Sequence, residues 1–397
     1  MSQTNNGTSI AVSLKLLLPL LASIVAVSPL AIDMYLPAMP LLADNFSTDM
    51  PTIQNSLSIY LLGYSLGLFL VGPLSDKYPR RRMVLIGLTG FFVFSVLLIF
   101  AQTAEQFLLL RFCQAFISSA AIVVVPGTIR ERYKENTAKG FSYVSMIMML
   151  APMVAPSIGS IMLLHSWQAI FMFLAGYSML VLLAAYKFLP EAQHKSGNKS
   201  LNFFKRYRVV LSHKSARLDI LSSMLVSLAF FAFITSVTFI YMTVYNVAEF
   251  EFSLLFACTV LGLMTAHFTN TRLVTRLGSR KMMALGLSIG VTCASGLLLV
   301  NFLEYPLFYT VATLIPLMGS ISIMAVNADA MVLLQFSEEA GTATAVIGIL
   351  RFGVGSLAGP ILAFFYDGTA LPFAFLMWSS IFIVFLIQLI HLVRIKR

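Results

Sequence analysis

The amino-acid sequence predicts an all-α integral membrane protein whose twelve transmembrane helices form two pseudo-symmetric six-helix bundles. Hydrophobic residues make up 59% of the chain and charged residues only 11%, and the mean hydropathy is +0.89. Long unbroken apolar runs recur along the sequence, and about 20 such residues let a helix cross a bilayer core of about 30 Å. This composition excludes an ordinary soluble domain, and the runs lack the alternation of a membrane β-barrel.

The apolar runs predict twelve spans at residues 14–35, 52–74, 83–101, 105–129, 139–163, 167–188, 217–241, 251–271, 282–301, 306–327, 341–365 and 371–393. If the N-terminus is cytoplasmic, every Lys and Arg lies at a cytoplasmic end except Arg111 and Arg351, which lie inside spans. Cytoplasmic loops carry an excess of Lys and Arg. We therefore expect both termini in the cytoplasm, and the net charge of +10 needs no nucleic-acid partner.

The two halves of the sequence repeat each other. Residues 74–83, LSDKYPRRRM, align with residues 273–282, LVTRLGSRKM, about half a chain later. A polar, basic stretch separates the halves. We therefore expect an N-terminal bundle at 1–189, a cytoplasmic linker loop at 190–216 and a C-terminal bundle at 217–397.

A loop rich in arginine, GPLSDKYPRRR, follows the second span. A glycine lets helices approach closely, and an acid at a helix end can hold basic groups of a neighbour. The loop resembles the major facilitator signature Gly-x-Leu-x-Asp-Arg-x-Gly-Arg-Arg, and two parallel six-helix halves are the plan of that superfamily. The resemblance implies a latch that closes the cytoplasmic side, formed by Gly72, Asp76, Arg80 and Arg81. The alternative is a loop whose charge only sets the topology.

The first span ends in the string PLAIDMYLPAMP at residues 29–40. This string resembles the end of the first helix in the Bcr/CflA-type drug resistance transporters, a branch of the twelve-span drug/proton antiporters. Asn327, Ala328 and the stretch GTATA at 341–345 extend the resemblance to span eleven. The resemblance implies a bacterial inner-membrane protein that exchanges drugs for protons and uses the proton gradient without a cofactor.

Asp33 lies in the outer part of span one, within an apolar context. Burial disfavours the ionised form of a carboxyl group and a nearby Arg favours it, so a membrane acid under both influences can carry a proton. The alternative places Asp33 at the interface as a solvated helix end. Arg111 lies about six residues into span four, or about 9 Å at 1.5 Å per residue. An arginine at this depth is expected to face a cavity or an acid.

The sequence around Arg111, RFCQA, resembles the family signature Arg-x-x-Gln-Gly in the fourth helix. The resulting hypothesis is that Asp33 and Arg111 interact, directly or through water. Protonation of Asp33 would then free Arg111 and change the affinity of the cavity for substrate. The alternative is a structural pair that holds two helices together.

Span five contains two prolines and several small residues in the stretch LAPMVAPSIGS at 150–160. Prolines remove intrahelical hydrogen bonds and bend a helix, and small residues allow close packing. The stretch resembles the antiporter motif of exporting family members, and its key residues would be Pro152, Pro156 and Gly159. The alternative is ordinary packing between membrane helices.

The substrate pocket is expected to be apolar and aromatic, because Met and aromatic side chains repack around varied ligands. The candidates are Tyr35, Tyr60, Tyr64, Met146, Met149, Phe231 and Arg351. The alternative for each is a lipid-facing or core position. Arg351 lies about ten residues into span eleven, and depth along the helices argues against Asp329 or Asp219 as its partner. His267 is expected to be an interfacial histidine.

The predicted function is proton-coupled export of amphipathic drugs by alternating access, with the bilayer, the drugs and protons as partners and a monomer as the working unit. The alternative is a proton-coupled exporter of one metabolite, such as a sugar or amino-acid derivative, which would need a defined polar pocket. An enzyme is not expected, because no nucleophile–base arrangement is visible. The sequence also has no phosphate-binding Gly-x-x-x-x-Gly-Lys-Ser/Thr loop and no cluster with metal-ligand spacing.

Overall fold

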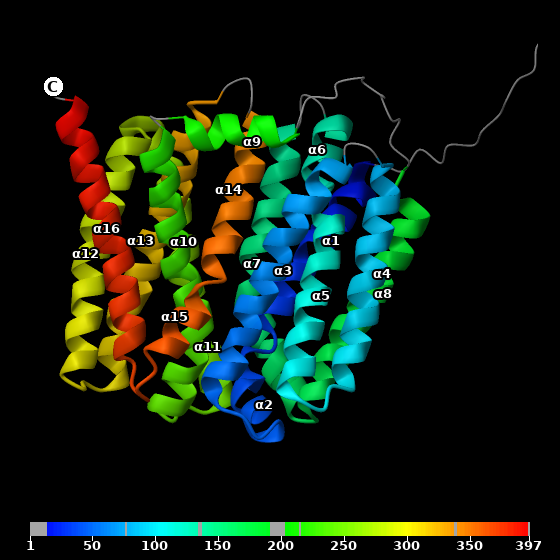
Figure 1. Ribbon diagram of the computed structural model, residues 1–397, viewed down its shortest axis with the longest axis horizontal. Coiled ribbons are helices and arrows are strands. Elements are labelled where there is room, and N and C mark those ends of the chain that lie inside the picture. The colour runs from blue at the N-terminus through cyan, green and yellow to red at the C-terminus, as the bar shows by residue number, and fades with distance from the viewer. Residues whose placement is uncertain are drawn as a thin grey trace, which may run out of the picture.

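The computed structural model describes residues 14–75, 78–133, 137–190, 203–213, 216–336 and 340–395. Over these ranges the regular structure is helical, and the long helices run side by side between two opposite ends of the molecule (Figure 1). Within the same ranges, 12 helical segments are long and apolar enough to cross a membrane. The predicted all-α fold with twelve spans is confirmed.

The first six spans begin with α1 (Leu14–Asp33), which the 3₁₀ turn η1 (Leu36–Ala38) and the short helix α2 (Met39–Asn45) extend. The others are α3 (Met50–Ser75), α4 (Arg80–Ile99), α5 (Ala104–Ile122) with α6 (Val125–Tyr133), α7 (Thr137–Leu163) and α8 (Trp167–Phe188). Side-chain caps fix two of the starts. The hydroxyl oxygens of Thr103 and Ser166 accept hydrogen bonds from backbone N–H groups three residues later.

The other six spans follow α9 (Phe203–Ser212). They are α10 (Ala216–Thr238) with the π-helix η3 (Phe239–Val244), α11 (Glu249–Leu277), α12 (Ser279–Phe302), α13 (Leu307–Leu333), α14 (Ala340–Gly355) with α15 (Ala358–Phe364), and α16 (Leu371–Ile395). The expected linker loop thus contains a helix, α9. Its Tyr207 and Val210 are buried, and the Tyr207 ring packs 5.9 Å from that of Phe69, centroid to centroid. These two apolar residues are about one helical turn apart and pack inward together, so this part of the linker is helical.

Two spans are broken in mid-course. Residues 123–124 separate α5 from α6, and residues 356–357 separate α14 from α15. Pro126 and Pro360 lie in the first turn of the helix that follows each break. A proline fits the first turn of a helix but not its interior, so each proline favours a new helix at that point.

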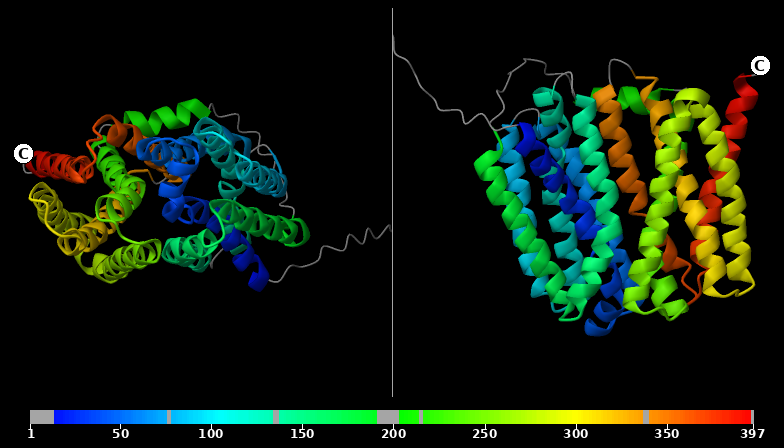
Figure 2. Two further views of the ribbon diagram at one scale, coloured as in Figure 1. Left: turned by 90° about the horizontal axis from the view of Figure 1, so that it is seen from below. Right: turned by 180° about the vertical axis from the view of Figure 1, so that it is seen from behind.

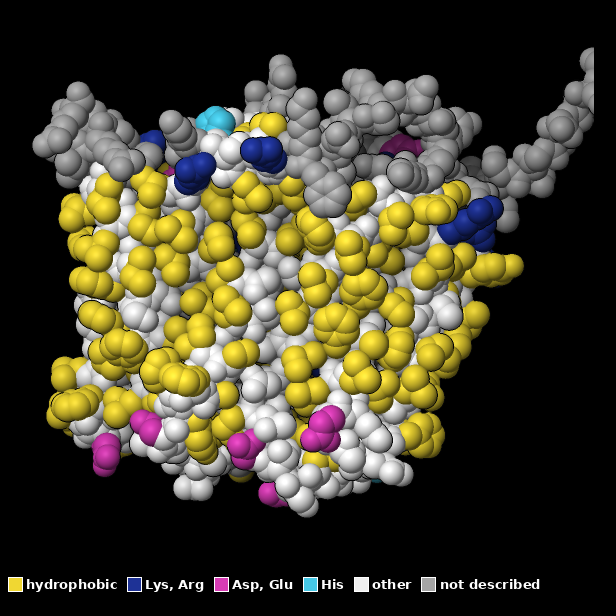
Figure 3. All heavy atoms as spheres, viewed as in Figure 1, with side chains coloured by type: hydrophobic (Ala, Val, Ile, Leu, Met, Phe, Trp, Pro, Cys, Tyr) yellow, Lys and Arg dark blue, Asp and Glu magenta, His cyan; other side chains and the backbone are white. Residues whose placement is uncertain are grey.

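Charge divides the two ends of the molecule. We call the end with Arg80, Lys187 and Arg276 the basic face, and the end with Glu105 and Glu304 the acidic face. Figure 3 shows both, with Lys and Arg above a band of hydrophobic side chains and most of the visible Asp and Glu below it. The band is the surface expected for contact with lipid.

The helices form two bundles that lie side by side, as the view from below in Figure 2 shows. In the first bundle α3 packs on α5, α4 on α8 and α1 on α7; in the second α12 packs on α13, α11 on α13 and α10 on α16. The bundles meet where α14 and α15 pack on α3 and where α11 packs on α7. A cavity between the bundles is bounded by residues of α1, α3, α5 and α7 on one side and of α10, α11, α13 and α14 on the other.

Candidate functional site

A cavity of about 330 Å³ lies between the two bundles. Its walls are mainly apolar, with five phenylalanines and three methionines, namely Phe230, Phe231, Phe233, Phe256, Phe352, Met148, Met149 and Met318. Its polar lining is sparse and consists of Ser28, Asp33, Tyr64, Ser227, Thr259, Ser322 and Arg351. Such a surface suits a ligand with a large apolar body and few polar groups.

Asp33 is the last residue of α1 and its side chain belongs to the cavity wall. The residue is only 3% exposed, so the interpretation as a solvated helix end is wrong. Among the residues that the structure describes, its carboxyl group forms no ion pair and no hydrogen bond. Asp33 is thus a buried acid that faces an apolar cavity without a countercharge.

Arg111 of α5 is fully buried and does not line the cavity. One of its terminal nitrogens donates to Gln114 Oε1 at 2.8 Å and the other to the backbone oxygen of Ala31 at 3.0 Å. The guanidinium carbon also lies 4.3 Å from the ring centroid of Tyr35 and 4.4 Å from that of Tyr60. Two aromatic faces and two oxygen acceptors therefore compensate the buried charge.

The structure does not contain the direct contact between Asp33 and Arg111 that the sequence suggested. Arg111 instead binds α1 through Ala31, whose carbonyl belongs to the last turn of that helix. The last carbonyls of a helix lack intrahelical partners and carry partial negative charge, so a cation there is stabilising. Arg111 thus contacts the last turn of the helix that ends at Asp33, and among the described residues it forms no ion pair with that acid.

Helix α7 packs directly against the segment that carries Asp33. A Cβ atom at Gly159 would lie 2.9 Å from the carbonyl carbon of Met34 and would overlap its oxygen, so only glycine fits. Pro156 is buried in the same helix, and Pro152 lines the cavity. The small residue at 159 thus allows the close approach that the sequence predicted for this helix, and the neighbour is α1.

Only some of the expected pocket residues line the cavity. Tyr64, Met149, Phe231 and Arg351 do so. Tyr35, Tyr60 and Met146 do not line it. The two tyrosines are fully buried because their rings enclose Arg111, and Met146 is 49% exposed on another face of α7. Sequence spacing does not show which side of a helix faces the partner bundle, so these three expectations were wrong.

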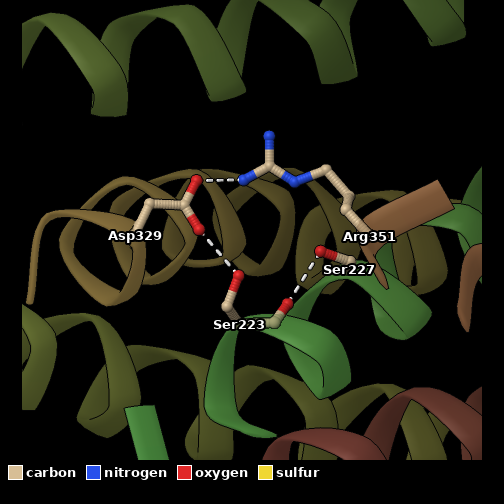
Figure 4. Close-up of polar contacts among 4 residues, drawn as sticks. All are labelled: Ser223, Ser227, Asp329 and Arg351. Atoms are coloured by element: carbon tan, nitrogen blue, oxygen red, sulfur yellow. Dashed lines mark hydrogen bonds and ion pairs between the residues drawn. The ribbon is translucent and has the colours of Figure 1, made fainter. Parts of the chain in front are cut away.

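Arg351 of α14 forms an ion pair with Asp329 of α13, which corrects the depth argument against this partner. The other carboxylate oxygen of Asp329 accepts a hydrogen bond from the Ser223 hydroxyl at 2.7 Å (Figure 4). Side chains on a helix lean toward its N-terminus, and α14 begins at the basic face, near which Asp329 lies. The Cα atom of Arg351 lies at a different depth in the membrane from Asp329, but its long side chain spans this difference and reaches the acid.

The arginine-rich loop after α3 makes contacts within the first bundle. Arg80 forms an ion pair with Glu131 of α6 at 2.7 Å, and Arg81 donates a hydrogen bond to the backbone oxygen of Tyr186 in α8. Asp76 lies outside the described residues. Among the described residues, a Cβ atom at Gly72 would meet no atom within 4 Å.

Specific contacts join the bundles between the acidic face and the middle of the molecule. Ser160 of α7 and Ser253 of α11 share a hydrogen bond of 2.8 Å near the acidic face. The Ser58 hydroxyl oxygen accepts a hydrogen bond of 2.9 Å from the Gly359 backbone N–H. Further inward, the rings of Tyr64 and Phe352 pack edge to face with centroids 4.6 Å apart. These contacts hold the two bundles together on the side of the acidic face.

No group of three or more His, Cys, Asp or Glu residues that could hold a metal ion occurs in the described part of the chain. The polar and charged groups of the cavity wall are Asp33, Arg351 and several hydroxyl groups. These groups can bind a ligand and exchange a proton.

Comparison with known proteins identifies relatives over nearly the whole chain. The model of the Major Facilitator Superfamily matches residues 21–360. A bicyclomycin resistance protein homolog of Haemophilus influenzae is 29% identical over 364 residues, which cover 89% of this chain and 90% of that protein. A chloramphenicol resistance protein of Pseudomonas aeruginosa is 30% identical and covers 92% of this chain and 87% of its own length.

The multidrug transporter MdfA of Escherichia coli is 26% identical over 370 residues, with 89% of each chain covered. Among solved structures, the nucleoside transporter NupG has a TM-score of 0.74 at 13% identity and covers 93% of this chain and 99% of its own. A bacterial homolog of the lysosomal transporter Spinster has a TM-score of 0.66 at 15% identity, with 94% of each chain covered. These two structures share the fold.

Proposed function

The chain belongs to the Major Facilitator Superfamily, and from this premise we propose that it exports amphipathic drugs in exchange for protons. Relatives that align over most of the chain are named for resistance to bicyclomycin and chloramphenicol and for multidrug transport. The observation that carries the proposal is Asp33, an acid in the wall of an apolar cavity that has no ion-pair partner in the described part of the chain. The ionised form of this carboxyl group favours drug binding, and the protonated form does not. Proton binding and drug binding therefore exclude each other.

The proposed cycle uses two rigid units. Residues 1–189 and 217–397 rock about the cavity, and the stretch 190–216 links them. In this proposal the basic face is cytoplasmic, because Lys and Arg are retained on that side of a bacterial inner membrane, and both termini lie in the cytoplasm. In this proposal the contacts near the acidic face close that side in this state, and drug enters from the cytoplasm.

Proton coupling follows from the position of Asp33 in this cycle. A drug enters the cavity while Asp33 is ionised, and the bundles then rock until the acidic side opens. An external proton neutralises Asp33, weakens drug binding and lets the bundles return. Arg111 holds the end of α1 through Ala31 and the two tyrosine rings, so the carboxyl group stays at the cavity when its charge changes.

Helix α7 and the arginine-rich loop have supporting roles in the proposal. Gly159 lets α7 pack directly against the backbone of Met34, the residue next to Asp33. Arg80 and Arg81 hold the start of α4 to α6 and α8, so the loop moves with the first bundle. When the acidic side opens, Gly72 and Asp76 would close the basic side against the second bundle. The transporter needs no cofactor for these steps and works as a monomer.

The test is drug uptake into everted membrane vesicles, with the interior acidified and the membrane potential clamped to zero. A gradient of one pH unit corresponds to about 1.4 kcal/mol per proton, which supports up to about tenfold accumulation for one proton per drug. We expect chloramphenicol or bicyclomycin to accumulate with the wild-type chain. Asp33→Asn should reduce accumulation to the level without a gradient.

The matched control is Asp219→Asn, because Asp219 is also a buried acid but lies outside the cavity, where Gln335 donates a hydrogen bond to it. This variant should keep gradient-driven uptake. Full uptake in Asp33→Asn would remove the coupling role of Asp33. Absence of gradient-driven uptake of either drug by the wild-type chain would refute the export function itself.

A further inference from the structure

The two arginines inside the spans differ in their access to the cavity. Arg111 is 0% exposed, lies outside the cavity wall and uses both terminal nitrogens on protein oxygens. Arg351 lines the cavity, and its side chain is 35% exposed. A ligand in the cavity can therefore meet the positive charge of Arg351 but not that of Arg111.

The guanidinium of Arg351 has donors to spare. Its only protein partner in the described residues is Asp329, which one terminal nitrogen binds. Figure 4 shows the other terminal nitrogen directed away from this acid. A guanidinium carries five N–H donors in a planar fork that matches the oxygens of carboxylates and similar anions. One edge of the fork is occupied and the other remains available.

The acid partner is held in place independently of the arginine. The Ser223 hydroxyl donates to Asp329, and the Ser227 hydroxyl donates to the backbone oxygen of Ser223 at 2.7 Å. Asp329 thus orients the guanidinium group of Arg351, and its negative charge competes with a ligand anion for that group. The walls next to it, Phe231 and Phe352, offer an apolar surface with ring centroids 5.6 Å apart.

From this geometry we propose that Arg351 forms an anion subsite of the cavity, which binds the carboxylate or sulfonate of an amphipathic organic anion. The apolar body of the ligand lies against the phenylalanine wall, and its anionic group takes the free edge of the guanidinium. The proposal rests on the proposed export function and adds a substrate class to it. Asp329 is a positioning residue that also restrains the affinity of the subsite for anions.

The test compares two fluorescent probes that differ by one charge. Anilinonaphthalene sulfonate carries a sulfonate, and N-phenyl-1-naphthylamine has the same aromatic body without it. Binding to the purified full-length chain in lipid nanodiscs is followed by fluorescence, with the signal of empty nanodiscs subtracted. The variants are Arg351→Gln, Arg351→Lys and Asp329→Asn, and the control is Arg272→Gln, which removes a positive charge at the exposed basic face.

We expect Arg351→Gln to weaken binding of the sulfonate by about tenfold, the range of a charge-assisted hydrogen bond, with the neutral probe within about twofold. Arg351→Lys should lose less, because the charge stays but the fork is lost. Asp329→Asn should strengthen sulfonate binding, because the competing anion is gone. Arg272→Gln should change neither probe.

Opposite effects of Arg351→Gln and Asp329→Asn on the affinity for the sulfonate distinguish a subsite from a structural ion pair. In a structural pair, removal of either partner would lower that affinity. The proposal is overturned if the wild-type chain does not bind the sulfonate, if Arg351→Gln weakens both probes equally, or if Asp329→Asn leaves sulfonate binding unchanged or weaker. Should Arg351→Gln fail to fold, Asp329→Asn and Arg351→Lys decide alone. Uptake of uncharged chloramphenicol by vesicles with the wild-type chain tests export separately, so the export function can stand while the subsite fails.

Discussion

The close packing of α7 on α1 predicts that Gly159→Ala will damage both stability and transport. A methyl group at this position would overlap the backbone oxygen of Met34 and lie 2.9 Å from its carbonyl carbon, whereas ordinary contacts begin at about 3.4 Å. Backbone atoms cannot rotate away as a side-chain end can, so the two helices must separate locally. Overpacking of this kind typically costs about 1–3 kcal/mol.

The displaced residue is adjacent to Asp33, so the effect should extend to coupling. We expect Gly159→Ala to lower the free energy of unfolding, measured by reversible SDS titration in mixed micelles, by about 1–3 kcal/mol. Gradient-driven uptake in everted vesicles should fall by more than the amount of folded protein does. At the same pH gradient and the same amount of protein in the membrane, the variant should therefore accumulate less drug than the wild-type chain.

Gly176→Ala is the matched control, because Gly176 lies on an exposed face of α8 and a Cβ atom there would meet nothing within 4 Å. Alanine is the better helix former by about 1 kcal/mol, so this variant should be at least as stable as the wild-type chain. If Gly159→Ala proved as stable and as well coupled as Gly176→Ala, the inferred contact between α7 and the Asp33 segment would be refuted.

Three further outcomes are expected. In the wild-type chain, drug affinity should rise with pH as Asp33 loses its proton, whereas Asp33→Asn should bind drug with the same affinity at every pH tested by equilibrium binding; a parallel pH dependence in both would contradict the role of this acid. Arg111→Lys should lower the free energy of unfolding in SDS titration by about 2 kcal/mol, because an ammonium cannot serve two oxygen acceptors and two tyrosine faces at once, and an unchanged stability would argue against the arrangement. A double-mutant cycle of Ser160→Ala and Ser253→Ala should give a coupling free energy of about 0.6 kcal/mol between the two serines. Each variant should also make cysteine residues more accessible to reagents added at the acidic face. Additive effects without that increase would show that the hydrogen bond does not help to close this side.

The twelve spans and the division of charge between the two ends could be predicted from the sequence, because both depend on one-dimensional properties. The cost of placing each residue in lipid sums along a helix, and the retention of Lys and Arg acts on loops in chain order. The same reasoning located Asp33 and Arg111 inside spans, where charge is costly and needs a special environment. The glycine in α7 was also recognised as a packing position.

Partners and facing directions could not be predicted in this way. Tyr60 and Tyr64 are one helical turn apart in α3, yet the first encloses Arg111 and the second lines the cavity. A small difference in rotation about the helix axis decides between these two environments. Likewise, the pairing of Arg351 with Asp329 depends on the reach of a long side chain toward the basic face.

The chain alone thus determined that the protein crosses the membrane twelve times, which end is basic and which charged groups are embedded. Tertiary structure decided that Arg111 is enclosed by two aromatic rings, that Asp33 lines the cavity with no ion-pair partner among the described residues, and that Arg351 also lines this cavity. The physical reason is that transfer free energy is a property of each residue in its segment, whereas contact depends on the rotation and packing of neighbouring helices. Those angles arise only when the two bundles have assembled around the cavity.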